Sequence, residues 1–220
     1  MKAKGLSMIH DVDRREGQSN NKMILWTIQP LTVWKALQSK GQIQAREFFV
    51  DKHFRPAYRW MRDQMRLRLG PPPSSISFPL WAWYQWQGAS KKRPDLRFSG
   101  HLPSGETGVL IEFLAETNEV LLSDFELWHY VLNYLYLPSS TKDEAQFDSI
   151  MASFAANTPS EVANRHRVFH QDVRESWERI FDTRWSRRDI ASSFTRKTIQ
   201  ATLWRLRRKQ VRNWATFKAR

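Results

Sequence analysis

Three tryptophans and a tyrosine stand within six consecutive residues, from Trp81 to Trp86. Aromatic side chains bury large apolar areas, so the 11 tryptophans of this 220-residue chain require a substantial core. Alternation along a strand divides the run into two sets that face opposite sides of a sheet: Trp81, Trp83 and Gln85, and Ala82, Tyr84 and Trp86. We expect one set to lie in the core, so the whole run cannot form one ligand-binding surface.

Local patterns predict that strands and helices follow one another along the chain, with strands near both ends. Alternation and β-forming residues predict strands at 24–29, 79–86, 109–113 and 119–122, and a terminal strand pair at 198–204 and 211–217. Helical spacing predicts helices from Pro30 to a stop at Gly41, from Arg55 to a stop at Gly70, over 127–137 behind a Ser123/Glu126 capping box, and from a Thr158 cap through Ile180. This order favours an α+β fold over a doubly wound sheet.

The ends of the chain and its composition bound the domain organisation. Residues 1–22 are polar and lack the apolar stretch of a signal peptide, so we expect a disordered N-terminal extension before a single domain at 23–220. No apolar run approaches the roughly 18 residues of a membrane span. The absence of cysteine excludes disulfides and thiolate chemistry, and we predict a cytoplasmic protein without membrane partners.

Positive charge is concentrated in the last quarter of the chain. The formal net charge is +13, and residues 165–220 hold sixteen Lys and Arg against five acidic residues. Such a field favours polyanions, so we expect nucleic acid as a partner, or failing that an acidic protein. An ordinary solvated helix face is the plain alternative. The candidate phosphate contacts are Arg187, Arg188, Arg205, Arg207, Arg208 and Lys209.

Several common catalytic and metal-binding motifs are missing from the sequence. It contains no GxGxxG, GxxxxGK[ST] or GxSxG pattern, which leaves the usual dinucleotide, P-loop and hydrolase interpretations without support. His166 and His170 stand four residues apart on the expected long helix, but no glutamate follows the first histidine and no cysteine adds a ligand. We therefore predict no metal site.

The informative residues are polar ones set within apolar segments. Thr27 and Gln29 share a strand face, and so do Gln200 and Thr202 near the end of the chain. Glu112 lies inside an apolar strand, where a buried carboxylate needs a hydrogen-bonding or charged partner, or a functional role. Further polar candidates gather at the start of one helix: Asp124, His129 and Asn133. For each, a satisfied buried hydrogen bond or an ordinary helix cap is the plain alternative.

Eight segments together resemble a bacterial family catalogued as a domain of unknown function. The resemblance runs from about Met23 to Arg220 and rests on ILWTIQPLTVWKALQSKG, GPPP, FPLWAWYQWQG, KRPDLRFSGHL, GVLIEF, VLLSDFELWHYVLN, SWERIFD and IQATLW…FKAR. It covers nearly the whole chain and implies little about activity.

A second resemblance concerns the opening and closing segments alone. LWTIQPLTVWKALQSKGQI is similar to the start of small ADP-ribosyltransferase-like domains such as the DarT-type DNA-modifying toxins, and Gln200-Ala201-Thr202 resembles their closing strand. This resemblance implies an α+β split sheet with inserted helices and a site for NAD. The implied cofactor contacts are Trp26, Thr27, Gln29, Tyr84, Arg93, Asp95, Arg97 and His101, and the implied catalytic residues are Glu112, Gln200 and Thr202.

The sequence departs from the transferase pattern at two positions. No histidine stands in the first strand, and Thr202 occupies the place of the expected carboxylate, so Glu112 or another acid must supply the charge, or the domain binds without catalysis. We expect an NAD-dependent ADP-ribosyltransferase-like protein that acts on DNA or RNA, in the manner of a toxin or a phage-defence effector. Two other interpretations stay open: a non-catalytic nucleic-acid-binding module and a basic adaptor of a bacterial conflict system.

Overall fold

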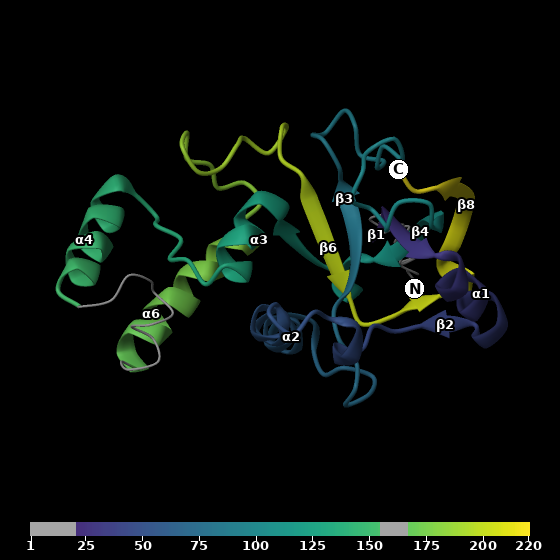
Figure 1. The fold of residues 1–220 in the computed structure, drawn as a ribbon, viewed down its shortest axis with the longest axis horizontal. Coiled ribbons are helices and arrows are strands. Elements are labelled where there is room, and N and C mark those ends of the chain that lie inside the picture. The colour runs from purple at the N-terminus through teal and green to yellow at the C-terminus, as the bar shows by residue number, and fades with distance from the viewer. Residues whose placement is uncertain (1–20, 155–166) are drawn as a thin grey trace, which may run out of the picture.

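A six-stranded antiparallel sheet organises the computed structural model, which describes residues 21–154 and 167–220 (Figure 1). Its strands, in spatial order, are β5 (Leu121–Asp124), β6 (Ile199–Leu203), β3 (Leu80–Gln85), β1 (Lys22–Pro30), β4 (Thr107–Glu116) and β8 (Val211–Lys218). A small second sheet pairs β2 (Gln42–Ile43) with β7 (Leu206–Arg207).

Five α-helices accompany the sheet in the described residues, and the protein is a single mixed α/β domain. They are α1 (Leu31–Lys40), α2 (Arg55–Leu69), α3 (Phe125–Leu132), α4 (Thr141–Ala152) and α6 (Arg167–Ser176). Short 3-10 turns form η1 (Glu47–Phe49), η2 (Thr117–Glu119), η3 (Trp177–Phe181) and η4 (Arg208–Gln210). None of the helices in 21–154 and 167–220 is long and apolar enough to cross a bilayer.

Most of the expected elements are confirmed. Gly41 ends α1 as predicted, with φ at 75° and its N–H donated to the Leu37 carbonyl, a left-handed position that glycine adopts without strain. Two other expectations concern residues that the structure does not describe: the N-terminal extension, except Asn21 and Lys22, and the Thr158 helix start.

Three local predictions are wrong. The two terminal strands do not pair, because β6 binds β3 and β5 while β8 binds β4 at the far edge of the sheet. The α3 cap is Asp124 rather than Ser123, since the Asp124 carboxylate accepts from the N–H groups of Glu126 and Leu127. Beyond Trp83, a register shift in β3 breaks the expected alternation, and Trp86 packs edge-on against Trp83 at 4.7 Å.

The two faces of the sheet are covered by different elements. Leu80 and Ala82 of β3 belong to a cluster with α1, whereas Trp81 packs with residues of α2, α3 and η3. In Figure 1, α4 and α6 extend beyond α3 on the side away from β8. The alternation predicted for Trp81 and Ala82 is therefore confirmed, and it places Trp81 beneath the helices that flank the candidate site.

The sheet is split between β1 and β3. These strands are in register at only one position, Trp26 with Trp83, whereas β1 and β4 pair over nine. Just past the contact, the Thr27 hydroxyl donates to the Trp81 carbonyl at 2.8 Å. A side-chain hydrogen bond thus satisfies a carbonyl that a continuous ladder would pair with a backbone N–H.

A buried ion pair fixes the start of α3 to the loop before β6. The Lys197 ammonium lies 2.6 Å from the Asp124 carboxylate, and each side chain is only 1% exposed. Lys197 also donates to the Trp185 carbonyl at 2.6 Å. Removing one partner of such a pair leaves an uncompensated charge in the interior, which is costly.

We predict that Lys197→Met lowers the free energy of unfolding by about 3–5 kcal/mol, because the Asp124 carboxylate loses its counter-charge in a buried site. The matched control is Lys22→Met, since Lys22 pairs with Glu116 at 3.2 Å on the surface and its loss costs about 1 kcal/mol or less. Urea unfolding measures both. Equal effects of the two substitutions would contradict this account of the buried pair.

Candidate functional site

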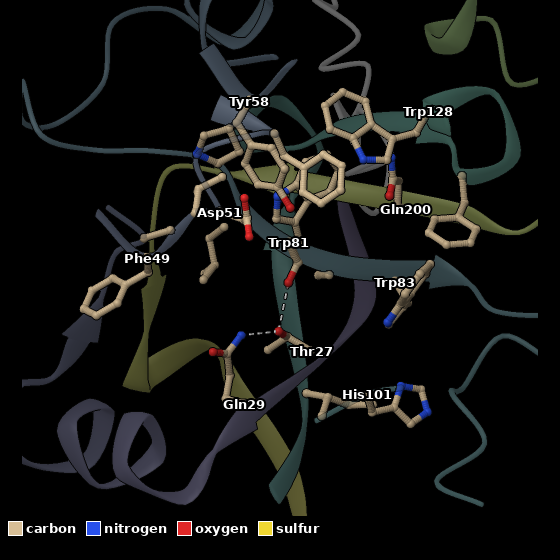
Figure 2. Close-up of a pocket in the computed structure, with 18 of the residues that line it drawn as sticks. Thr27, Gln29, Phe49, Asp51, Tyr58, Trp81, Trp83, His101, Trp128 and Gln200 are labelled. Carbon is tan, nitrogen blue, oxygen red and sulfur yellow. Dashed lines mark hydrogen bonds between the residues drawn. The ribbon is translucent and has the colours of Figure 1, made fainter. Parts of the chain in front are cut away.

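The split between β1 and β3 opens into a cavity of about 540 Å³ (Figure 2). Its walls come from β1, β3, α3, the Gly100–His101 loop, Gln200 of β6 and the segment that joins β2 to α2. This volume lies within the range of small-molecule sites, which hold ligands in largely preformed concave pockets.

Aromatic rings form one wall of the cavity. Tyr58, Trp81 and Trp128 pack mutually, with ring centroids 5.0–5.7 Å apart. Trp83 lines the cavity further along and packs edge-on against Phe125. Burial raises the pKa of Tyr58, so its hydroxyl stays protonated at neutral pH and can donate a hydrogen bond. The wall suits a planar ring, and a cationic ring best of all.

A hydrogen-bond chain on β1 fixes the orientation of the Gln29 amide. The Thr27 hydroxyl has one proton, which it gives to the Trp81 carbonyl, so its oxygen accepts from Gln29 Nε2 at 2.7 Å. The Gln29 carbonyl oxygen is therefore the end of the amide left to accept from a ligand. Figure 2 shows this chain at one side of the pocket.

Gln200 supplies the complementary group. Its side chain is 3% exposed and lines the pocket, yet its Nε2 has no hydrogen-bond partner among the described residues. The same holds for Trp81 Nε1 and for the hydroxyl of Ser123, which stands opposite Gln200 in the register of β5 and β6. A buried unpaired donor costs about 1–3 kcal/mol, so the arrangement points to a ligand that accepts.

Asp51 is the single carboxylate among the described residues that line the pocket. One of its oxygens accepts from the His53 N–H at 2.9 Å, which fixes the turn before α2. Figure 2 shows the carboxylate directed towards the interior of the cavity, close to Tyr58. Any step that needs a negative charge in the pocket can use Asp51.

The structure brings four residues that the sequence nominated to this one pocket: Thr27, Gln29, His101 and Gln200. The His101 ring packs against Trp86 at 5.0 Å, and its Nε2 lies 2.9 Å from the Asp95 carbonyl oxygen. Residues from the first and the late strand therefore share one site.

Three nominated residues lie in a separate depression of about 310 Å³: Trp26, Arg93 and Glu112. The Glu112 carboxylate accepts from the Trp26 indole N–H at 3.2 Å, and Arg212 lies 3.9 Å from it. Glu112 thus has a hydrogen-bond partner and does not line the pocket that holds Thr27.

The remaining cofactor and catalytic candidates also lie outside the pocket lining. Arg97 is engaged by Asp95 on an exposed loop, and its hydrogen bonds hold the pKa of that carboxyl well below its usual range. The Tyr84 ring faces the Lys92 ammonium at 5.3 Å. Thr202 is fully buried and donates to the Leu121 carbonyl at 3.3 Å.

The polar residues around α3 have structural contacts. Asp124 caps the helix and pairs with Lys197. His129 Nδ1 lies 3.0 Å from the Phe125 carbonyl oxygen, and the Asn133 amide donates to the His129 carbonyl at 2.8 Å. These contacts match the alternative to a functional role, which was a satisfied hydrogen bond or an ordinary helix cap.

The six basic residues nominated as phosphate contacts differ in ion pairing and in exposure. Arg187 pairs with Glu144 and Asp189, and Arg207 pairs with Glu119. Arg205 is half-buried. The exposed members are Arg188, Arg208 and Lys209.

Sequence reasoning missed the segment between β2 and α2, which contributes Arg46, Phe49, Asp51 and Phe54 to the pocket. The segment has neither helical nor strand periodicity, so pattern analysis passed over it. One signal was available: three phenylalanines interleaved with charged residues in EFFVDKHFR.

Together the fold and site define a mixed α/β protein with an aromatic pocket at a split in its antiparallel sheet. Residues 24–212 match the family model described as Domain of unknown function (DUF3841), and the chain belongs to this family. The family membership expected from the sequence is confirmed. No curated protein and no solved structure matches the chain.

We predict that Gln200→Met leaves the free energy of unfolding unchanged or raises it by about 1 kcal/mol, because it removes a buried donor without a partner. Gln85 on β3 is the matched control, since its Nε2 donates to the carbonyls of Phe194 and Lys197 at 2.8 and 2.7 Å. Gln85→Met leaves both carbonyls without a hydrogen-bond donor and should lower the free energy of unfolding by about 1–3 kcal/mol. Thermal and urea unfolding measure both variants. A loss in Gln200→Met as large as in Gln85→Met would show that Gln200 is an ordinary core residue.

Proposed function

We infer that this protein is an ADP-ribosyltransferase that holds NAD⁺ in the pocket between β1 and β3 and modifies nucleic acid. The observation that carries the inference is the convergence of Thr27, Gln29 and Gln200 on one pocket. These residues come from opposite ends of the chain, and their segments are the two that resemble the opening and closing strands of such transferases. The split sheet supports a related fold.

The polar groups of the pocket complement a nicotinamide carboxamide. That amide carries one acceptor oxygen and one NH₂ donor. Gln200 Nε2 is an unpaired donor, and the hydrogen-bond chain through Thr27 leaves the Gln29 oxygen as an acceptor. A ligand carboxamide could donate to the Gln29 oxygen at one side of the pocket or accept from Gln200 Nε2 at the other.

The aromatic wall favours the binding of a cationic nicotinamide ring. The nicotinamide ring of NAD⁺ is cationic, and the faces of tryptophan and tyrosine attract cationic rings. Tyr58, Trp81 and Trp128 offer such faces within the pocket. Nicotinamide becomes neutral as it leaves, which weakens this attraction and eases its release.

The transfer needs a negative charge beside the ribose. The bond between ribose C1′ and the pyridinium nitrogen breaks, nicotinamide leaves with the electron pair, and an acceptor nitrogen or oxygen bonds to C1′ and loses its proton. Positive charge develops on the ribose in between, and a nearby carboxylate stabilises it. Asp51 lines the pocket, which supports this role for it, while Glu112 is the carboxylate that the sequence nominates.

The net charge of +13 and the exposed cations Arg188, Arg208 and Lys209 support nucleic acid as the acceptor. Modification of DNA or RNA would suit a toxin or a phage-defence effector. The same cations favour the second candidate, a non-catalytic nucleic-acid-binding module.

The test is incubation with labelled NAD⁺ and separate DNA, RNA and protein acceptors. We expect label on nucleic acid, and we expect Asp51→Asn to lower the transfer rate by about 100-fold or more while NAD⁺ still binds, because the substitution removes charge without removing the pocket. Glu112→Gln is the matched control and should keep the wild-type rate.

Two outcomes would change this assignment. A loss of transfer in Glu112→Gln with full activity in Asp51→Asn would assign the carboxylate role to Glu112. No transfer to any acceptor together with no NAD⁺ binding would reject the transferase and leave the binding module as the function.

A further inference from the structure

Three large aromatic side chains are exposed in one short segment at the mouth of the pocket. Within the mouth segment, which we define as residues 46–55, Phe48 is 83% exposed, Phe49 79% and Phe54 42%. Phe49 and Phe54 also line the pocket. Single exposed apolar residues are ordinary, but three phenylalanines gathered at the entrance of a cavity indicate an interaction surface.

The rings of Phe48 and Phe49 touch each other and leave their faces open. Their centroids lie 5.6 Å apart in an edge-to-face arrangement, and neither ring belongs to the two core clusters of the described residues. Flat faces without a protein partner are suitable for stacking on planar ligands.

Cations are interleaved with these rings. Arg46 and Lys52 are exposed, and neither has an acidic partner in the parts of the chain that the structure describes. Of the two acids in the mouth segment, Glu47 is neutralised by Arg59 at 2.5 Å, and Asp51 lines the pocket and accepts from the His53 N–H. The mouth segment therefore presents unpaired positive charge next to open aromatic faces.

We propose that the mouth segment binds single-stranded nucleic acid, with bases stacked on Phe48 and Phe49 and phosphates on Arg46 and Lys52. Base stacking on aromatic side chains, combined with cations that follow the backbone, is how single strands are held without sequence preference. A strand bound here passes the pocket entrance at Phe54, so one nucleotide reaches the site. The proposal rests on the proposed function for its acceptor class and assigns the surface that presents this acceptor.

Other occupants fit the observations less well. A membrane surface would favour a larger apolar face than the mouth segment offers, and a second copy of this chain would bring its own net charge of +13 against these cations. A polyanion with planar bases complements both the charge and the ring faces.

The test measures fluorescence anisotropy of labelled DNA and RNA oligonucleotides of about ten nucleotides, with no NAD⁺ present. We expect Phe48→Ala/Phe49→Ala to weaken binding about tenfold or more, because two stacking faces are lost. The matched control is Leu67→Ala/Ile76→Ala, which removes two apolar side chains that are 78% and 53% exposed outside the mouth segment. This control should bind as the wild type does.

Charge is tested separately with Arg46→Gln/Lys52→Gln. We expect the magnitude of the slope of log affinity against log salt concentration to fall by about 1.4, since two phosphate contacts to a single strand are removed. Lys142→Gln, an exposed cation on α4, is the control and should leave the slope unchanged.

Wild-type affinity in the Phe48/Phe49 variant would overturn the proposal. So would binding to anionic phosphatidylglycerol vesicles without binding to either oligonucleotide, which would assign the segment to a membrane surface. The readout is independent of NAD⁺. The wild-type protein could bind oligonucleotides yet neither bind NAD⁺ nor transfer label. If the Phe48/Phe49 variant then loses oligonucleotide binding, the binding surface is supported and the transferase is rejected. The DNA and RNA arms identify which nucleic acid is held.

Discussion

The divergence of β1 from β3 after the Trp26–Trp83 contact is the constraint on which the site depends. A continuous antiparallel ladder would close the space between these strands and leave no cavity. The hydroxyl of Thr27 compensates for the split, because it donates to the Trp81 carbonyl that the ladder leaves open. The same oxygen then accepts from Gln29 and sets which end of that amide faces a ligand. One threonine thus stabilises the opening and orients the group that lines it.

Buried polar groups around the pocket are of two kinds. Gln85, Asp124 and Lys197 are joined through a buried ion pair and hydrogen bonds to carbonyls, and together they hold β3, α3 and the start of β6 in a fixed relation. Gln200 lies at the centre of this frame with an unpaired amide nitrogen. Other buried donors without a partner occur in the described residues, among them Arg62 Nε and Trp86 Nε1, but Gln200 and Trp81 are the ones that line the pocket. This position in the lining is the reason we propose that a ligand pairs with Gln200.

Local sequence patterns predicted most strands and helices, and they nominated Thr27, Gln29 and Gln200, because polar residues within apolar segments carry a readable signal. His101 was nominated only through the transferase resemblance. The pairing predicted for the two terminal strands was wrong, since pairing depends on contacts between distant segments: β6 and β8 are close in sequence but lie apart in the sheet. Glu112 was nominated for its apolar surroundings, which cannot reveal that the Trp26 indole lies beside it. Asp51 escaped notice because its segment has no period, and its position is set by a turn and by the helix that follows.

The pocket and the mouth segment differ in chemistry. This difference suits them to the two separate substrates that the proposals require, NAD⁺ and nucleic acid. The pocket combines aromatic faces with one carboxylate, Asp51, and one arginine, Arg46, and its aromatic wall favours a cationic ring. The mouth segment presents exposed rings with unpaired cations, which favours a stacked polyanion. A nucleotide cofactor would place its nicotinamide inside and its pyrophosphate towards the cations, while the acceptor strand stays at the rim. Asp51 belongs to the mouth segment and also lines the pocket, so under the proposed function this carboxylate lies where the two binding regions adjoin.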